Sequence, residues 1–375
     1  MRVRTALLRE MGAPPPYAES RPLEIAEVEL DPPGSGELLI RVGAAGLCHS
    51  DLSVIDGSRP RVMPMALGHE AAGEVVETGG GVSAFAPGDH VVLAFVPACG
   101  DCPPCRAGRA ALCEPGAAAN AAGTLLGGER RLRHPDLGPL NHHLGVSAFS
   151  DHIVVSEASA VKVDPELPFE LAALFGCAVL TGVGAAVNAA RIEAGQRVVV
   201  FGLGGVGLSA LLGAVLREAA TIVAVDVMVA KLELARELGA THAVGAGPGA
   251  LAEILDLTGG GADHAIETVG SAGVLADAYA ATRRGGTTTT VGLPDPSQML
   301  TIPAVSLVAE ERTLRGSYLG SSVPARDIPR FVDLHREGRL PVERLLTHRL
   351  ALDEVNEGFD RLASGAAVRQ AIVFA

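Results

Sequence analysis

The feature that most constrains the fold is the hexapeptide GLGGVG at residues 202–207. It follows the apolar run RVVVF and precedes the apolar stretch LSALLGAVL, so it predicts a tight turn between a buried strand and a helix. Asp226 ends the next apolar run, TIVAVD, about twenty residues further on. A G-x-G-x-x-G motif in this context predicts a βαβ unit that binds a dinucleotide. The alternative is a Gly-rich turn that only packs a helix against a strand.

The carboxylate of Asp226 favours NAD over NADP as the dinucleotide. It would accept hydrogen bonds from the ribose hydroxyls of the adenosine and would repel a 2′-phosphate. Glycines would let the backbone approach the pyrophosphate at the helix N-terminus. The candidate contacts in this turn are Gly202, Gly204, Gly205, Val206 and Gly207.

Along the rest of the chain, the pattern of apolar and polar residues changes twice. Up to about residue 178, short apolar or alternating runs such as ELLIRV predict a β-rich region. From 179 to 319, strand-like and helix-like runs alternate, which predicts a parallel sheet with helices on both faces. Beyond 320, two amphipathic helices and a final strand, AIVFA, are expected. Residues 114–143 predict a long loop, and residues 287–305 are the candidate for the edge of the parallel sheet.

Four of the six cysteines form the pattern C-x2-C-x2-C-x7-C at Cys99, Cys102, Cys105 and Cys113. Four thiolates can close a tetrahedral shell around Zn²⁺, which defines a structural zinc site. An iron–sulfur cluster usually has x3 and a following Pro at the fourth position, and disulfides are uncommon in a reducing compartment. The pattern therefore favours a structural zinc lobe at residues 97–115 over these two alternatives.

The two remaining cysteines are Cys48, in LCHSD, and Cys177, and a GHE tripeptide contains His69. Two cysteines and one histidine with an open fourth position can form a catalytic zinc site. A single cysteine is more often a small buried apolar residue, and a single histidine is more often structural. Grouping these three residues therefore depends on the motifs around them.

The net charge of −13 disfavours nucleic acids and anionic membranes as partners. Two apolar stretches, 172–190 and 198–216, lack charged residues, but a strand, a Gly turn and a buried helix explain the second better than a membrane span does. The N-terminal residues have no long apolar core typical of a secretory signal. We therefore expect a cytoplasmic protein with neither a membrane nor a nucleic acid as partner.

Several motifs occur in one order along the chain: LCHSD, GHEAAGEV, the four-cysteine lobe, GCAVLTGVGAA, GLGGVG, AVD and VRQAIVF. Together they resemble the zinc-dependent medium-chain alcohol dehydrogenases over essentially the whole chain. The resemblance implies an α/β protein with a GroES-like β-barrel catalytic domain at 1–178 and 320–375. A Rossmann domain with a doubly wound parallel sheet, which binds NAD, would occupy 179–319. It also implies a homodimer or, alternatively, a homotetramer.

The resemblance assigns roles to individual residues. Cys48, His69 and Cys177 would bind the catalytic zinc, Glu70 would lie beside the metal, and Asp51 would orient a ligand. Zinc would bind the alcohol oxygen as a Lewis acid, Ser50 would pass its proton outward, and hydride would go to the nicotinamide. Further cofactor contacts would be His49, Thr181, Asp226, Lys231, Val291, Gly292, Leu293 and Arg369. The substrate pocket would contain Phe95, Leu293, Tyr318 and Leu319.

This apolar pocket favours a primary or aromatic alcohol, or the matching aldehyde, as substrate. Ser53 stands where well-studied animal members have the histidine that ends the proton relay, so we expect an altered pH–rate profile. The alternative activity is that of a thiol-adduct or formaldehyde-type dehydrogenase, but the sequence after Cys113 lacks the Arg typical of the glutathione-dependent branch. Cys177 disfavours polyol dehydrogenases. A quinone reductase or a non-catalytic relative would lack the zinc ligands, which are all present here.

Overall fold

The structure is a computed structural model, and it describes residues 1–374. The chain forms two compact units. The first unit contains residues 1–177, 323–333 and 346–374, and the second contains residues 178–322 and 334–345. The assignment of a catalytic and a cofactor-binding domain to these parts stays a prediction.

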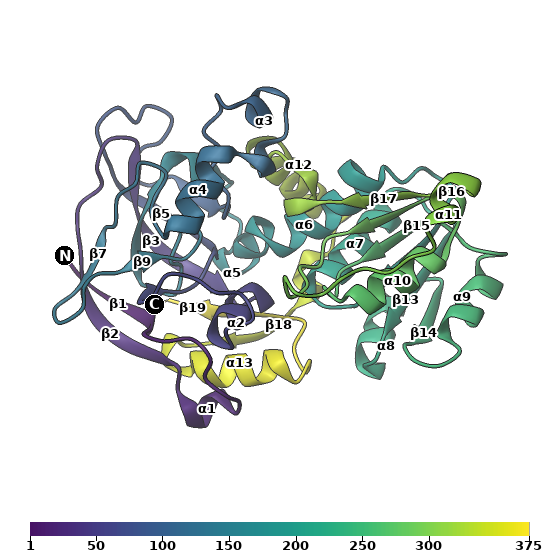
Figure 1. Cartoon of the computed structure of the whole chain (residues 1–375). Coiled ribbons are helices and arrows are strands. Elements are labelled where there is room, and N and C mark those ends of the chain that lie inside the picture. The colour runs from purple at the N-terminus through teal and green to yellow at the C-terminus, as the bar shows by residue number, and fades with distance from the viewer. Residues whose placement is uncertain (375) are drawn as a thin grey trace. The chain divides into compact units, whose positions relative to one another are not determined.

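Two sheets build the first unit (Figure 1). The strands of one sheet, in the order β8-β7-β2-β1-β4-β9, are β1 (Arg2–Leu8), β2 (Leu23–Leu30), β4 (Met65–Ala66), β7 (Leu132–His134), β8 (Gly138–Pro139) and β9 (Asn141–His142). The strands of the other, in the order β11-β6-β5-β3-β19-β18 with β10 also on β3, are β3 (Glu37–Gly46), β5 (Glu70–Thr78), β6 (His90–Leu93), β10 (His152–Ser156), β11 (Ala160–Lys162), β18 (Leu346–Leu350) and β19 (Arg369–Val373). From Ala26 to Leu30 the alternation in AEVEL explains why β2 buries one face and exposes the other.

Short helices connect these strands, and the C-terminal segment completes the unit. The helices are α1 (Tyr17–Ser20), α2 (His49–Ile55), α3 (Pro103–Arg106), α4 (Glu114–Ala122), α5 (Phe169–Ala172), α12 (Pro324–Arg336) and α13 (Val355–Ala363). Strand β19 pairs with β3, and Phe359 of α13 packs edge-on against Phe149 with ring centroids 6.1 Å apart. Burial of such apolar groups fixes the C-terminal helix and strand in the core of the first unit. Both C-terminal helices and the closing strand were predicted from the sequence and are confirmed.

The second unit is built on one parallel sheet in the order β14-β13-β12-β15-β16-β17. Its strands are β12 (Arg197–Phe201), β13 (Thr221–Asp226), β14 (His242–Gly245), β15 (Ala262–Glu267), β16 (Thr282–Thr290) and β17 (Thr313–Gly316). Its helices are α6 (Ala178–Gly184), α7 (Gly205–Leu216), α8 (Val229–Glu237), α9 (Ala250–Leu257), α10 (Ala272–Ala280) and α11 (Ala304–Ala309). The continuous apolar run Val198–Val200 is fully buried because helices cover both faces of the sheet. This confirms the predicted α/β fold.

Two predictions about local structure were wrong. Residues 114–143 are not a long loop, since they contain α4 and strands β7, β8 and β9. The Ala- and Gly-rich sequence of α4 has no amphipathic pattern, and the Sγ atom of Cys113 caps the helix by accepting the N–H of Gly116 at 3.4 Å. The Thr-rich run is not at the edge of the parallel sheet, because β17 pairs with β16 outside it.

Within residues 1–374, no single helix is long and apolar enough to cross a membrane. By length and composition alone, one bent pair of helical segments, Phe169–Gly176 with Ala178–Ala190, could do so. The residues of α6, which begin the second member of this pair, are all buried in the protein.

Candidate metal and cofactor sites

Cys48, His69 and Cys177 meet in the first unit, and one ligand atom from each lies within 4.8 Å of the others. All three side chains are buried. Strand register explains the first two, because β3 and β5 pair with Gly46 opposite Glu70, so the residues just beyond the two strand ends are neighbours. Cys177 follows Gly176, where a Cβ atom would lie 2.3 Å from the carbonyl oxygen of Leu93, so only glycine lets this segment approach β6. The structure therefore brings together the three predicted ligands from distant parts of the chain.

The two thiols of this cluster differ in how readily they ionise, and only Cys48 is favoured as a thiolate. The pKa of the Cys48 thiol is held well below its usual range by the hydrogen bond from Cys177 and by His69. The same Cys48–Cys177 contact, together with burial, raises the pKa of Cys177 well above its usual range. The Sγ atom of Cys177 lies 3.5 Å from Nε2 of His69. Two sulfurs and one imidazole nitrogen are the soft and borderline donors that Zn²⁺ prefers.

Asp51 lies beside His69, in a place that suits the orienting role that the resemblance implies for it. Nδ1 of His69 lies 3.0 Å from Oδ1 of Asp51, while Oδ2 accepts the backbone N–H of Cys48 at 3.1 Å. Burial alone would raise the pKa of Asp51, but the imidazole of His69 lowers it below its usual value. An ionised carboxylate only accepts hydrogen bonds, so Nδ1 carries a proton. Burial would lower the pKa of His69, but Asp51 and Cys48 raise it well above its usual value, so a metal at Nε2 would displace a second proton.

Glu70 and Arg369 form a buried ion pair beside the cysteines. Burial raises the pKa of Glu70, and the guanidinium of Arg369 opposes this shift. Burial would lower the pKa of Arg369, but the charges of Glu70 and Cys48 raise it above its usual value. The structure thus places Arg369, predicted to contact a pyrophosphate, against Glu70 in the first unit, and its contact with a cofactor stays a prediction.

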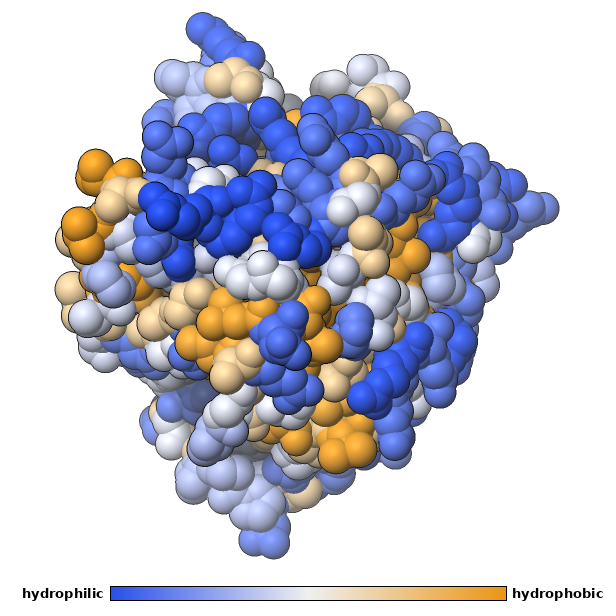
Figure 2. Space-filling model, turned by 90° about the vertical axis from the view of Figure 1, so that its right-hand side faces the viewer, coloured by the Kyte–Doolittle hydropathy of each residue, from blue (hydrophilic) through white to orange (hydrophobic). Residues whose placement is uncertain are grey.

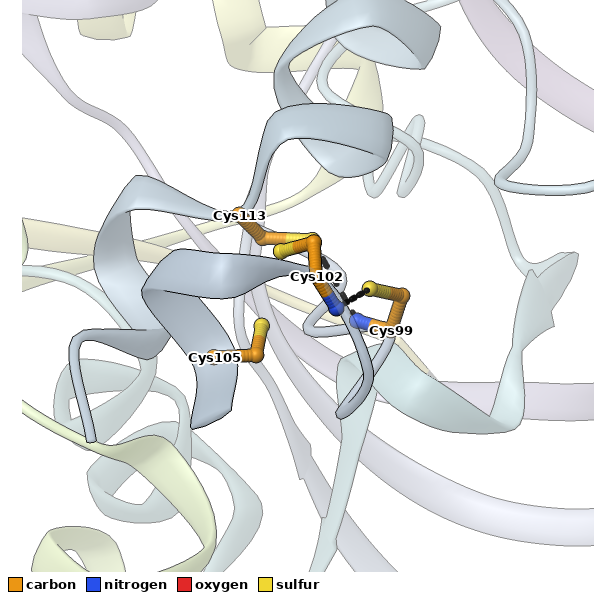
Figure 3. A group of neighbouring side chains, drawn as sticks. All are labelled: Cys99, Cys102, Cys105 and Cys113. Atoms are coloured by element: carbon orange, nitrogen blue, oxygen red, sulfur yellow. Dashed lines mark hydrogen bonds between the residues drawn. The ribbon is translucent and has the colours of Figure 1, made fainter. Parts of the chain in front are cut away.

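The four lobe cysteines form a second cluster, with one Sγ atom from each within 4.8 Å of the others. Figure 3 shows their side chains turned toward one another, with Cys105 on α3. All four are free thiols, so the structure contains no disulfide here. The backbone N–H of Cys99 donates to Sγ of Cys113 at 3.3 Å, and that of Cys102 donates to Sγ of Cys99 at 3.4 Å. Amide donors of this kind stabilise negative charge on sulfur, as a four-thiolate metal site requires.

The cysteines of this lobe differ in how readily they ionise. Backbone hydrogen bonds from Asp101 and Cys102 lower the pKa of Cys99 to about 7. Burial raises the pKa of Cys105 to about 12. The lobe therefore holds thiolate charge most readily at Cys99, and a bound cation would have to supply the stabilisation that Cys105 lacks.

In the second unit, the Gly-rich turn joins β12 to α7 as predicted. Gly202 has φ 86°, and a Cβ atom on Gly207 would lie 1.7 Å from the carbonyl oxygen of Gly202, so both positions need glycine for the protein's own packing. Gly204 is different, because a Cβ atom there would meet no protein atom within 4 Å. Oδ2 of Asp226 accepts the N–H of Leu203 at 2.6 Å and so ties the turn to the end of β13.

A cavity of about 140 Å³ lies in the second unit, lined by residues at the ends of β12 and β13. Its walls are mostly apolar and include Phe201, Val225 and Ile254, with the carboxylate of Asp277 as a polar group. Open parallel sheets bind ligands beyond the carboxyl ends of their strands, which is where Phe201 and Val225 lie. A flat apolar group with polar edges, such as an adenine ring, fits this description.

The structure also shows where the other predicted residues lie. Ser50 is half-buried in the first turn of α2, and the exposed His49 begins that helix. The ring of Phe95 stands perpendicular to that of His69, with centroids 5.4 Å apart. The remaining predicted contacts belong to the second unit, where Thr181 and Leu319 are buried, Lys231, Val291 and Gly292 are partly buried, and Leu293 and Tyr318 are exposed. The structure therefore gathers the predicted metal-site residues and Phe95 within one unit.

One buried residue beside the metal cluster was not predicted. Nδ1 of His143 lies 3.1 Å from Oδ1 of Asp51, and its ring packs edge-on against His69 with centroids 5.3 Å apart. Nothing in the sequence around LNHHLG separates this histidine from its neighbour His142.

Comparison with known proteins agrees with these sites. A family model described as an alcohol dehydrogenase GroES-like domain matches residues 34–165, and one described as a zinc-binding dehydrogenase matches residues 205–337. An NDMA-dependent alcohol dehydrogenase from Amycolatopsis methanolica is 39% identical over 386 residues, covering 100% of this chain and 99% of its own. The chain belongs to the zinc-dependent medium-chain alcohol dehydrogenases.

Other relatives of this dehydrogenase have several named activities. An S-(hydroxymethyl)glutathione dehydrogenase from Paracoccus denitrificans is 35% identical over 100% of both chains. Among solved structures, an alcohol dehydrogenase zinc-binding domain protein from Burkholderia ambifaria has a TM-score of 0.93 and 36% identity, covering 100% of this chain and 99% of its own. Benzyl alcohol dehydrogenase from Acinetobacter calcoaceticus has a TM-score of 0.92 and 32% identity over 100% of both chains. The predicted family and fold are confirmed, and the dehydrogenase is an oxidoreductase that acts on small alcohols or aldehydes.

Proposed function

We propose that this dehydrogenase transfers hydride between NAD and a primary or aromatic alcohol, with a catalytic zinc on Cys48, His69 and Cys177. The observation that carries the proposal is the buried cluster of three ligand atoms within 4.8 Å. One thiolate and one correctly oriented imidazole are already stabilised there by neighbouring residues. When bound, zinc would supply Lewis acidity toward an alcohol or carbonyl oxygen.

The chain's own residues then have separate tasks. Asp51 holds the imidazole of His69 in one tautomer and orientation. Ser50 lies two residues after Cys48 on α2 and accepts the substrate proton to pass it outward. Ser53, one turn further along, has no basicity near neutral pH, so the proton leaves through water. Cys99, Cys102, Cys105 and Cys113 hold a structural zinc, which makes two zinc ions per chain.

Three features of the second unit support NAD as the cofactor. The open space at Gly204 lets a pyrophosphate approach the backbone at the start of α7. Asp226 presents a carboxylate at the end of β13, which disfavours a 2′-phosphate. The cavity bordered by Asp277 fits adenine.

Two observations support an aromatic alcohol as substrate. Phe95 lies beside His69, and the chain is similar to a benzyl alcohol dehydrogenase. The alternative is a thiol-adduct dehydrogenase, which the relative from Paracoccus denitrificans favours. Against it, residues 114–118 after the lobe read EPGAA and contain no arginine.

We further propose a cytoplasmic homodimer that forms through the second unit. Strand β17 is the last strand on one side of the parallel sheet, and open edges of this kind are usually covered. Near it in sequence, Met299, Val305 and Val308 each expose more than two thirds of their surface. Figure 2 shows apolar groups gathered between hydrophilic ones on the face that it presents. Exposed apolar side chains of this number indicate an interaction surface.

The test is a metal analysis combined with NAD⁺ reduction over a panel of primary, secondary and aromatic alcohols, with and without a low-molecular-weight thiol. We expect about two zinc ions per chain and activity that is lost to a chelator and restored by zinc. Cys48→Ala should keep one zinc and lose activity. Full zinc content without activity toward any alcohol or aldehyde, or activity only with the thiol, would reject the leading proposal.

A further inference from the structure

We infer that His143 is a positioning residue for the metal site: it holds Asp51, which in turn holds the imidazole of His69. This inference rests on the proposed metal site at Cys48, His69 and Cys177. It starts from one contact, the 3.1 Å distance between Nδ1 of His143 and Oδ1 of Asp51. Both side chains are buried, with relative exposures of 1% and 0%.

The oxygen that His143 approaches is the one that His69 uses. Oδ1 of Asp51 lies 3.0 Å from Nδ1 of His69, and the other oxygen accepts the N–H of Cys48. The carboxylate is therefore surrounded by a predicted ligand's ring, a predicted ligand's backbone and His143. Removing His143 would free one side of the carboxylate to rotate away from His69.

Nδ1 of His143 has no other hydrogen-bond partner among the described residues. Within residues 1–374 it has no well-directed hydrogen bond, although it is buried. A buried ring nitrogen left without a partner is unfavourable, and its nearest carboxylate oxygen only accepts hydrogen bonds. The chemistry therefore assigns the proton of His143 to Nδ1, next to Oδ1 of Asp51, because a lone pair there would face the carboxylate.

His143 also restricts the ring of His69 directly. The two imidazoles meet at an interplanar angle of 87°, and the ring of Phe95 meets His69 at 90°. The backbone of His143 is itself fixed, because its N–H donates to the carbonyl oxygen of Ala66 at 3.3 Å. These contacts confine the direction in which Nε2 of His69 points toward the cysteines.

The alternative is that Asp51, His69 and His143 bind a second metal ion, since their ligand atoms lie within 4.8 Å of one another. Such an ion would bind Nδ1 of His69 while Nε2 faces the cysteines, so the imidazole would have to lose both protons. The 3.0 Å contact between His69 and Asp51 is a hydrogen bond, and the 3.1 Å distance from His143 to the same oxygen is within hydrogen-bonding reach, so neither contact requires a second ion. We therefore favour positioning over ligation.

The experiment follows zinc release to a chromogenic chelator from the holoenzyme and from His143→Ala, His143→Gln and Asp51→Asn. Loss of an outer partner of a metal ligand typically weakens the site by about 10–100-fold. We expect that loss for His143→Ala, and a smaller one for His143→Gln, which keeps an N–H donor. The matched control is His142→Ala, an equally buried neighbour whose ring bonds to Arg131 and Ser147 instead. It should release zinc at the wild-type rate even where its thermal stability falls.

The double variant His143→Ala/Asp51→Asn separates positioning from general structural support. Because the main effect of His143 passes through Asp51, the loss in the double variant should be far smaller than the product of the two single losses; only the ring contact with His69 can add to that of Asp51→Asn. Independent losses that multiply, an unchanged release rate in both His143 variants, or a third zinc per chain in the wild type would each overturn the inference. Failure of the proposed function is seen separately, because the wild-type holoenzyme would then lack zinc at Cys48 or lack NAD-dependent activity.

Discussion

His142 makes the first unit sensitive to acid in a way that a single substitution can test. Its ring is fully buried and accepts the backbone N–H of Arg131 at Nε2, at 3.0 Å, while Nδ1 lies 3.2 Å from the hydroxyl of Ser147. Burial and the positive charges of Arg130 and Arg131 lower the pKa of His142 to about 3. The neutral ring is therefore part of the folded structure, and protonation opposes it.

The sign and size of this pH effect on stability follow from the pKa of His142 in the folded and the unfolded protein. In the unfolded chain the pKa of a histidine is about 6.5. Between pH 6.5 and 3 the unfolded state binds a proton that the folded state does not, so stability falls as the pH falls. Integrated from pH 7 to pH 5, this one residue removes about 2 kcal/mol from the free energy of unfolding.

The assay compares urea unfolding of the zinc-loaded wild type and His142→Asn at pH 7 and at pH 5. At pH 7 the variant should be less stable by about 1–3 kcal/mol, because the backbone N–H of Arg131 loses its acceptor and the hydroxyl of Ser147 loses the N–H that it accepts. On acidification it should lose about 2 kcal/mol less than the wild type, since the other titrating groups are common to both proteins. Equal losses in the two proteins, or a ¹⁵N-histidine titration that places the pKa of His142 above 5, would refute the reasoning.

Three further substitutions test the cofactor and proton proposals. Gly204→Ala should leave the melting temperature of the cofactor-free protein unchanged but weaken NAD binding by about tenfold or more (about 1.4 kcal/mol). Gly207→Ala should lower both the melting temperature and the affinity for NAD. Calorimetric titration that finds normal NAD binding in Gly204→Ala would contradict the predicted pyrophosphate site. Asp226→Asn should raise the ratio of kcat/KM for NADP over NAD by about tenfold, and an unchanged ratio would mean that another group selects the cofactor. Ser53→His supplies a base one helical turn from Ser50, so the pH–rate profile should move toward neutral pH; an identical profile would show that the proton takes another route.

The parallel sheet was predictable because its strands are buried on both faces and are therefore continuous apolar runs. Its edge was not, because the run of threonines at 287–290 has a polar composition typical of an exposed strand. The hydroxyl of Thr288 pairs with that of Thr282 at 2.8 Å, which lets both side chains be buried next to β17. Both threonines belong to β16, and Gly285 between them has φ 69°, so their contact depends on a local irregularity of this strand that its polar composition does not reveal.

Helix α4 was also not predicted, because no local sequence pattern marks it. Its residues are mainly Ala and Gly, so no apolar periodicity marks it. It begins at a cysteine whose sulfur accepts an N–H of the first turn, and this same sulfur belongs to the lobe cluster. The helix thus begins at a cysteine of the lobe cluster, and a search for Ser, Thr, Asn or Asp caps does not find it.

The metal cluster could be predicted from the sequence only in part, and strand pairing explains the division. Cys48 and His69 are neighbours because β3 pairs with β5 in one sheet. His143 arrives from the other sheet, where β9 runs parallel to β4 with Ala66 opposite His142. Because β4 ends only three residues before His69, this second pairing sets His143 beside the same imidazole. Motifs along the chain identify the residues that we propose to bind the metal, but the histidine that we infer to support them is placed by a two-residue strand whose partner no sequence pattern reveals.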